Sequence, residues 1–124
     1  MKITQIGMDI AKSVFQLHGV DSHARVALKK KLKRSEVLAF FRATSVCEVG
    51  IKACGGAHHW AREISKLGRS VILIAPQFVK SYVKTNKNDA ADAEAICEAM
   101  SRPKMRFVPI KNTAQQDLKA IHRI

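Results

Sequence analysis

The first third of the chain alternates apolar and polar positions, a pattern typical of β-strands. In the second of these segments Phe15 and Leu17 share one face, and Gln16 and His18 share the other. The three segments cover residues 2–10, 13–20 and 24–32. Residues 19–23 between the last two are turn-like, so we expect these two strands to form a hairpin.

After this region the apolar spacing becomes helical. Val37, Phe40 and Phe41 follow Ser35, which is a suitable helix N-cap. The apolar run 70–75 is typical of a buried parallel strand. The expected helices cover 36–43, 57–68 (stopped by Gly68), 76–83 and 89–100 (capped by Asn88), and the remaining short strands cover 47–53, 70–75 and 106–110. This order predicts an α/β fold: a mixed sheet whose first three strands are antiparallel, with helices on both faces.

The composition narrows the class of protein. The chain has 124 residues, enough for one domain. Its 22 lysines and arginines outnumber its 10 acidic residues and give a net charge of +12. Such a balance favours a polyanionic partner, nucleic acid first of all, although a merely basic surface would have the same composition.

Other features of the sequence bear on its environment. The three cysteines show no CxxC spacing, which indicates reduced thiols and a cytoplasmic location. No apolar run is long enough for a membrane span, and the N-terminus has no signal-peptide core. The final segment NTAQQDLKAIHRI is helix-like without a cap, which suggests that the chain is a fragment.

Three aspartates are the candidate chemical groups. Asp89 and Asp92 are three residues apart on an expected helix, so they share a face and could hold a divalent cation. Alternatively they only stabilise the first turn through the helix dipole. Asp9 ends the first strand, where it could be a turn former or a third metal ligand.

Four segments of the chain resemble a known family. IGMDIAK, GIKACGGAHHWA, LIAPQFVKSYVKTNKNDAADAEAI and MRFVPIK are similar to the N-terminal domain of DEDD transposases of the insertion-sequence 110/1111 family, which includes the pilin-gene-inverting recombinases. The resemblance covers essentially the whole chain. It implies a RuvC-like, ribonuclease-H-like domain over residues 1–110, with residues 111–124 beginning a helix that connects to absent C-terminal parts.

The resemblance also implies an acidic tetrad that binds Mg²⁺ or Mn²⁺. Asp9 matches its first member, and Asp89 and Asp92 match its third and fourth. The position of the glutamate is occupied by Lys52, which cannot ligate a cation because an ammonium only donates. We expect Lys52 to pair with the aspartates and to weaken both metal binding and catalysis. The alternative is that Lys52 faces solvent and the glutamate is dispensable.

Neither neighbouring glutamate is expected to replace the missing one. Glu48 lies on the same strand face as Lys52 but about 13 Å away. Glu94 follows Asp92 by two residues and therefore points elsewhere on the helix.

Basic residues near these positions are candidate nucleic-acid contacts. They are Lys29, Lys30, Lys31, Lys33 and Arg34 in one run, and Lys80, Lys84 and Lys87 just before Asp89. The run could equally be a solvated edge strand protected by lysines. By resemblance, the ligands are DNA and a structured guide RNA.

The loop and helix around residue 57 carry further candidates. Gly55 and Gly56 either approach a phosphate or supply a tight turn with positive φ. His58 and His59 diverge on a helix, so zinc binding with Cys54 is disfavoured. Trp60 is expected in the core.

The resemblance implies one domain of an insertion-sequence transposase or recombinase that contributes a metal site to DNA strand cleavage and exchange. The family's catalytic serine lies in a second domain, so this chain is expected to be inactive alone and to act in a homo-oligomer or with a full-length transposase. Two alternatives remain. One is a non-catalytic, nucleic-acid-binding or regulatory transposase remnant, and the other is a free-standing RuvC-like nuclease, which Lys52 argues against.

Overall fold

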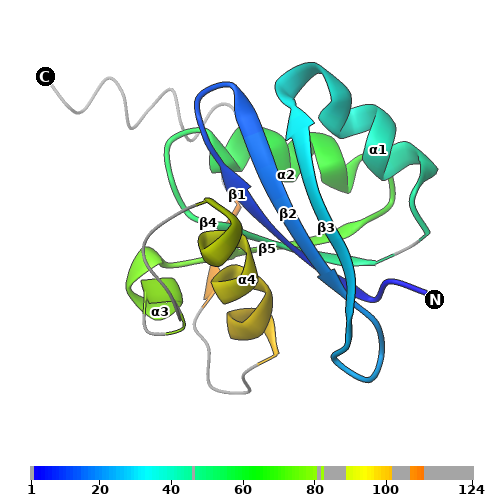
Figure 1. Cartoon of the computed structure of the whole chain (residues 1–124). Helices are drawn as coiled ribbons and strands as arrows, with labels where there is room; N and C mark the ends of the chain where they lie inside the picture. The colour runs from blue at the N-terminus through cyan, green and yellow to red at the C-terminus, as the bar shows by residue number, and fades with distance from the viewer. Residues whose placement is uncertain (1, 46, 81, 83–88, 102–106, 111–124) are drawn as a thin grey trace, which may run out of the picture.

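A computed structural model of the chain describes residues 2–45, 47–80, 82, 89–101 and 107–110 (Figure 1). In this part of the chain six strands form one sheet in the order β3-β2-β1-β4-β5-β6. The strands are β1 (Gln5–Ile10), β2 (Val14–Val20), β3 (Val26–Lys33), β4 (Glu48–Lys52), β5 (Ser70–Ile74) and β6 (Phe107–Val108). The helices are the short 3-10 helix η1 (Arg34–Glu36) and α1 (Val37–Ala43), α2 (Ala57–Ser65), α3 (Pro76–Lys80) and α4 (Asp89–Met100).

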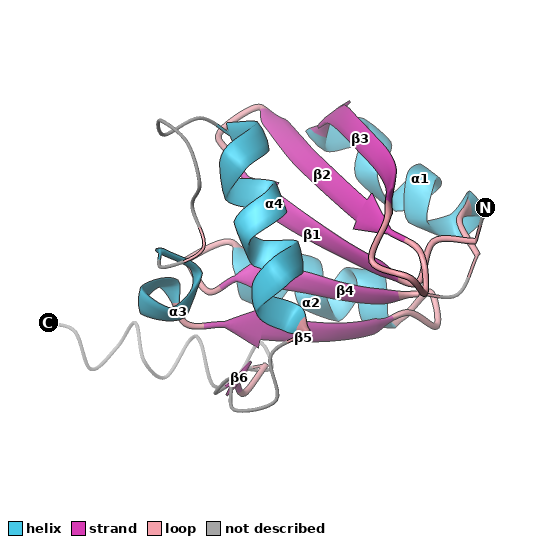
Figure 2. Cartoon of the chain, turned by 60° about the horizontal axis from the view of Figure 1, so that its bottom comes forward, coloured by secondary structure: helices cyan, strands magenta, loops and turns pink. Residues whose placement is uncertain are grey.

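The sheet is mixed, as the sequence predicts. β1, β2 and β3 pair antiparallel, whereas β4 pairs parallel with both β1 and β5. The short β6 pairs antiparallel with the end of β5. The expected β-strand and helix order is therefore confirmed, and helices cover both faces of the sheet (Figure 2). No helix in the described part of the chain is long and apolar enough to cross a membrane.

The turn between β2 and β3 differs from the prediction. Gly19 lies inside β2 and pairs with Leu28, so the turn does not begin there. It begins at Asp21, whose Oδ1 accepts hydrogen bonds from the backbone N–H groups of His23 and Arg25 at 2.8 and 3.0 Å. The bond from the Arg25 amide is the main reason why the pKa of Asp21 is lowered. An aspartate that satisfies two turn amides fixes the turn more firmly than a glycine does.

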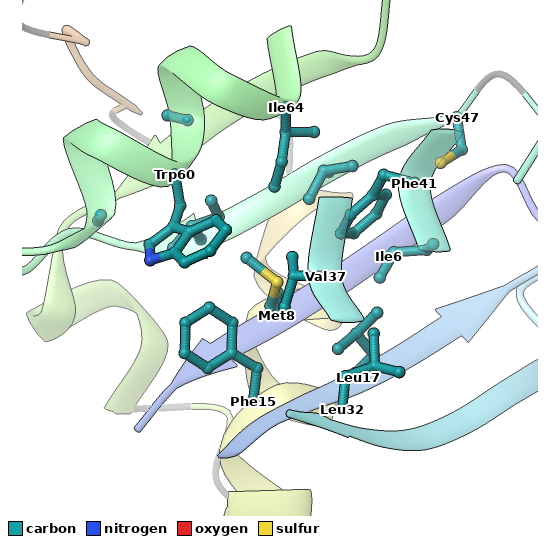
Figure 3. Close-up of a cluster of buried hydrophobic side chains, with 14 of the residues drawn as sticks. Ile6, Met8, Phe15, Leu17, Leu32, Val37, Phe41, Cys47, Trp60 and Ile64 are labelled. Atoms are coloured by element: carbon teal, nitrogen blue, oxygen red, sulfur yellow. The ribbon is translucent and has the colours of Figure 1, made fainter. Parts of the chain in front are cut away.

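One face of the sheet packs against α1 and α2 and holds the larger hydrophobic core (Figure 3). Ile6 and Met8 of β1 and Phe15 of β2 are fully buried there. Trp60 of α2 meets the Phe15 ring edge to face, with 5.0 Å between ring centroids. The prediction that Trp60 belongs to the core is confirmed.

The opposite face is covered by α3 and α4. Ile74 of β5, Val79 of α3 and Ile96 of α4 are buried in a smaller second cluster. Figure 2 shows α4 lying across the sheet, on the side away from α1 and α2. This second face carries Asp9 and Lys52.

The predicted Ser35 cap is wrong, and one of the two interpretations of Gly55 and Gly56 is excluded. Ser35 does not cap α1, because η1 precedes that helix and the Glu36 carboxylate accepts the Lys33 N–H at 2.8 Å instead. Gly55 and Gly56 have no positive φ: among the described glycines only Gly68, the expected stop after α2, does. α3 ends at Lys80, and Tyr82, which the sequence pattern places in this helix, lies in a turn. Positions 81 and 83, the Asn88 cap and residues 111–124 lie outside the described residues.

The thiols differ sharply in exposure, which predicts their reactivity. Cys47 and Cys97 are buried and Cys54 is exposed. Burial raises the pKa of Cys97 to about 11 and also raises the pKa of Cys47. Because the thiolate is the reactive form, we expect a disulfide reagent to modify one thiol quickly in the native protein and all three in denaturant. Rapid modification of a Cys54→Ser variant would contradict the packing around the other two.

Candidate functional site

Asp9 lies near the C-terminal end of β1 and only 5% of its surface is exposed. Side chains alternate along a strand, so Asp9 shares a face with Gly7, while Met8 between them points into the core under α1 and α2. Across the β1–β2 ladder Asp9 pairs with Gln16. The carboxylate therefore lies on the face that α4 covers.

Two glycines allow α4 to lie directly on the sheet. A methyl group on Gly7 would be 2.5 Å from the Ala93 carbonyl oxygen and 2.5 Å from the Cys97 amide nitrogen. A methyl group on Gly50 would lie 2.5 Å from the Met100 side chain. The close approach fixes the helix over the strand that carries Asp9.

The same contact orients the start of α4. Figures 1 and 2 both show the first turn of α4 on the side where β1 passes into β2, which is the Asp9 end of the strand. Asp92 is half-buried in that part of the helix and directly precedes Ala93. The backbone of Asp89 begins α4, and its side chain lies outside what the structure describes.

Lys52 lies beside Asp9 on the neighbouring strand. The parallel register pairs Met8 with Ile51, so the next residues, Asp9 and Lys52, are adjacent and on one face. The Lys52 Nζ lies 3.8 Å from Asp9 Oδ1, and the lysine side chain is 35% exposed. This is the ion pair that the sequence predicts, and it is a charge contact rather than a short hydrogen bond.

The described residues around Asp9 do not assemble a site for a divalent metal ion. Among the described residues, no group of three histidine, cysteine, aspartate or glutamate side chains is placed to hold one. A cation beside Asp9 would also meet the Lys52 ammonium, which carries like charge and no lone pair. The ammonium instead places a positive charge beside a buried carboxylate.

The two nearby glutamates are engaged elsewhere, as expected. Glu48 lies at the start of β4, where its Oε1 accepts a hydrogen bond from Gln5 Nε2 at 3.2 Å. Glu94 lines a cavity of about 400 Å³ with His18 and Glu98, toward the other end of α4. Neither glutamate takes the position of Lys52.

The basic run is divided between the two faces of the sheet. Lys29, Lys31 and Lys33 pair with His18, Gln16 and Val14, so they share the face of Asp9. Lys30 points to the other face, with its Nζ 5.8 Å from the centre of the Phe40 ring. β3 is an edge strand and these lysines are exposed, so they are accessible to a ligand and also protect the edge.

The structure describes only some of the remaining candidates. Lys80 is exposed at the end of α3, while Lys84 and Lys87 lie outside the described residues. Cys54 is exposed, whereas His58 is buried. The described part of the chain brings no zinc ligand set together.

Sequence reasoning missed two features of this region. Gln16 lies beside Asp9 in the ladder, and its place on the polar face of β2 was the available signal. The helix contact at Gly7 had no local signal, because it depends on a segment nearly ninety residues away in sequence.

The strand order, the mixed pairing and the two helical layers define a RuvC-like, ribonuclease-H-like fold. RuvC from Thermus thermophilus in complex with a Holliday junction substrate superposes with a TM-score of 0.52 and 13% identity, over 87% of this chain and 100% of that one. A second structure of the same protein gives a TM-score of 0.52 and 14% identity, over 84% of this chain and 99% of that one. Identity at this level establishes the fold alone.

The chain belongs to the IS110-type DEDD transposase family, whose model, described as a transposase, matches residues 6–124. A probable family 20 transposase of Pseudomonas aeruginosa is 56% identical over 124 residues, covering 100% of this chain and 37% of the relative. The transposase for insertion sequence element IS1111A of Coxiella burnetii is 47% identical over 119 residues, covering 96% and 33%. The chain thus spans about a third of the length of these relatives.

Proposed function

We propose that this chain is the nucleic-acid-binding N-terminal domain of an insertion-sequence transposase, with an acidic site that Lys52 has made inactive. The observation that carries the proposal is the ion pair between Lys52 and Asp9, on the face where the start of α4 brings Asp92. Family membership supports the acidic tetrad of Asp9, Asp89 and Asp92 with Lys52 in place of the glutamate. In such a tetrad Mg²⁺ or Mn²⁺ would stabilise the oxygens of a phosphodiester under attack.

The residues of this chain would bind DNA without cutting it. Lys29, Lys31 and Lys33 present three positive charges on the face of Asp9, and phosphate contacts of this kind position a duplex without reading its sequence. The Lys52 ammonium compensates the Asp9 charge and so lowers the repulsion between the acidic site and a phosphate. Guide RNA and a second transposase subunit are further partners that the family suggests.

A second candidate function rests on the same ion pair. A transposase domain that binds nucleic acid but cannot cleave it would compete with active copies for their substrate. We therefore propose regulatory binding as the alternative role. A free-standing nuclease is disfavoured, because the ion pair at Asp9 occupies the place of a metal ligand.

Binding and cleavage assays test the proposal together. Duplex DNA should bind in a strongly salt-dependent manner, and replacing Lys29, Lys31 and Lys33 by glutamine should lower the slope of log Kd against log salt by up to about 3. Lys66→Gln, just after α2, is a control for the loss of one surface charge away from this face. Linear and branched DNA should remain intact in Mn²⁺. Cleavage that an Asp9→Asn variant abolishes would overturn the proposal.

A further inference from the structure

A basic pocket lies beside the start of β2 and the end of β3, next to α2. It has a volume of about 790 Å³ and is lined by residues from the β1–β2 turn, η1 and α2. Its lining includes Lys12 and Ser13 of the turn, Lys33 and Arg34, and His59 and Trp60 of α2. Pockets of this volume accommodate a ligand the size of a nucleotide.

The pocket contains a buried donor that lacks an acceptor. Trp60 is 6% exposed, and its indole nitrogen Nε1 is buried with no hydrogen-bond partner among the described residues. Figure 3 shows this nitrogen on the edge of the indole turned away from Ile64 and Phe41, and thus away from the middle of the core cluster. Most buried polar groups in folded proteins have a partner, so an orphaned indole N–H calls for one. Because an indole N–H only donates, the partner has to be an acceptor.

The charges around the pocket select an anionic acceptor. Lys12, Lys33 and Arg34 contribute three positive charges, and none of the described residues that line the pocket is acidic. The nearby Glu36 carboxylate accepts the backbone N–H of Lys33. Phosphate oxygens combine negative charge with hydrogen-bond acceptance, and arginine recognises them with a paired geometry.

Arg34 is held at the mouth of the pocket. Its guanidinium carbon lies 5.8 Å from the centre of the Phe15 ring and 5.7 Å from that of Trp60, and its Nη1 donates to the Lys12 carbonyl oxygen at 3.2 Å. The side chain is nevertheless exposed. Two ring contacts and one hydrogen bond orient the guanidinium over the aromatic pair while leaving donors for a ligand.

An exposed ring adds a preference for a nucleotide over a free anion. His59 is exposed and meets Trp60 edge to face, with 5.2 Å between ring centroids. Single-stranded nucleic acid is bound by this combination of cations that track phosphates and aromatic rings that stack on unpaired bases. A paired duplex has no free base face to offer to such a ring.

We propose that this pocket binds a phosphate and the adjoining unpaired base of a single-stranded nucleic acid, with Arg34 and Lys12 on the phosphate and Trp60 Nε1 donating to it. The proposal rests on the nucleic-acid binding proposed for this domain and adds a second contact beside α2, whereas Lys33 belongs to the face of Asp9. The β1–β2 turn links this pocket to Asp9 along the chain. Asp9 lies shortly before the turn in β1, and Lys12 of the turn lines the pocket. DNA and RNA share the recognised chemistry, so both are tested.

The test uses the single tryptophan of the chain as a probe of its own pocket. Single-stranded oligonucleotides of about 12 nucleotides, one of deoxythymidine and one of uridine, are titrated while Trp60 emission and oligonucleotide anisotropy are recorded. Binding should change Trp60 emission with the same Kd that anisotropy gives. Tighter binding of one oligomer would identify DNA or RNA as the natural source.

Variants separate this pocket from the face of Asp9. Arg34→Gln should weaken single-strand binding by about tenfold. Trp60→Phe, which keeps an aromatic ring but removes the indole N–H donor, should weaken it by about fivefold. Lys2→Gln, exposed at the opposite end of β1, is the control and should change Kd by less than about twofold. Circular dichroism of Trp60→Phe checks folding, and Lys12→Gln, which alters no core residue, repeats the test independently.

Two results would contradict the proposed binding of single strands in this pocket. Single-strand binding that leaves Trp60 emission unchanged and ignores Arg34→Gln and Lys12→Gln would place the contact elsewhere, while the proposed DNA-binding function would stand. An absence of single-strand binding would also contradict the proposed role of the pocket. Duplex binding, measured in parallel, would then test the proposed DNA-binding function of the domain separately.

Discussion

Lys52→Glu is expected to make the thermal stability of the chain depend on Mg²⁺, whereas the stability of the parent protein is expected to stay unchanged by it. Without metal, the variant loses the cation beside a carboxylate that is 95% buried and adds another negative charge. Because Lys52 is itself partly exposed, the cost is about 1–2 kcal/mol, or a Tm lower by about 5–10 °C in EDTA. Mg²⁺ at about 100 times its Kd should then restore about 2.7 kcal/mol.

A matched variant separates loss of the lysine from gain of a ligand. Lys52→Gln removes the ammonium without adding a carboxylate, so it should lose stability in EDTA and gain little from Mg²⁺. The measurement is thermal unfolding of the three proteins in EDTA and in Mg²⁺. Equal Mg²⁺ responses in Lys52→Glu and Lys52→Gln would show that position 52 is not a ligand position.

Gly7→Ala is expected to be severely destabilising although it adds one methyl group. That methyl would lie 2.5 Å from the Ala93 carbonyl oxygen and 2.5 Å from the Cys97 amide nitrogen, both backbone atoms that cannot rotate away. The helix has to shift, and overpacking of this kind costs about 1–3 kcal/mol. Since α4 carries Asp92, the shift is also expected to displace Asp92 relative to β1.

Gly55→Ala is the control for this effect. It makes the same chemical change in a loop where an added methyl meets nothing within 4 Å, so its stability should stay within about 0.5 kcal/mol of the parent. Urea unfolding of the two variants measures the difference directly. Equal midpoints would contradict the direct packing of α4 on β1.

Local patterns were sufficient to predict much of the fold and part of the site. Strand alternation placed Phe15 and Leu17 on one face and Gln16 on the other, because that period is a property of the strand alone. The structure buries Phe15 and Leu17 in the core. The position of Lys52 beside Asp9 followed from motif matches and is confirmed as an ion pair. The roles of Asp89, Asp92 and the lysines stay predictions.

The features that the sequence analysis did not predict have two causes. Some depend on which of two neighbouring residues bonds a backbone amide, and others depend on contacts between segments far apart in the sequence. The turn after β2 begins at Asp21 rather than at Gly19, and Glu36 rather than Ser35 accepts a backbone N–H before α1. Each carboxylate reaches a backbone amide that the sequence alone could not assign to it. The Gly7 contact joins β1 to α4, and the pocket around Trp60 joins three segments. Such pairings are fixed by the tertiary fold and have no periodic signature.

The central claim is that Lys52 replaces a metal at an otherwise inherited site, and calorimetric titration of Mn²⁺ tests it most directly. The parent chain, Lys52→Glu, and Lys52→Glu combined with Asp9→Asn are titrated side by side. We expect Lys52→Glu to bind Mn²⁺ at least about tenfold more tightly than the parent, and the added Asp9→Asn change to abolish the gain. Equal Mn²⁺ affinity in the parent and Lys52→Glu would contradict the claim.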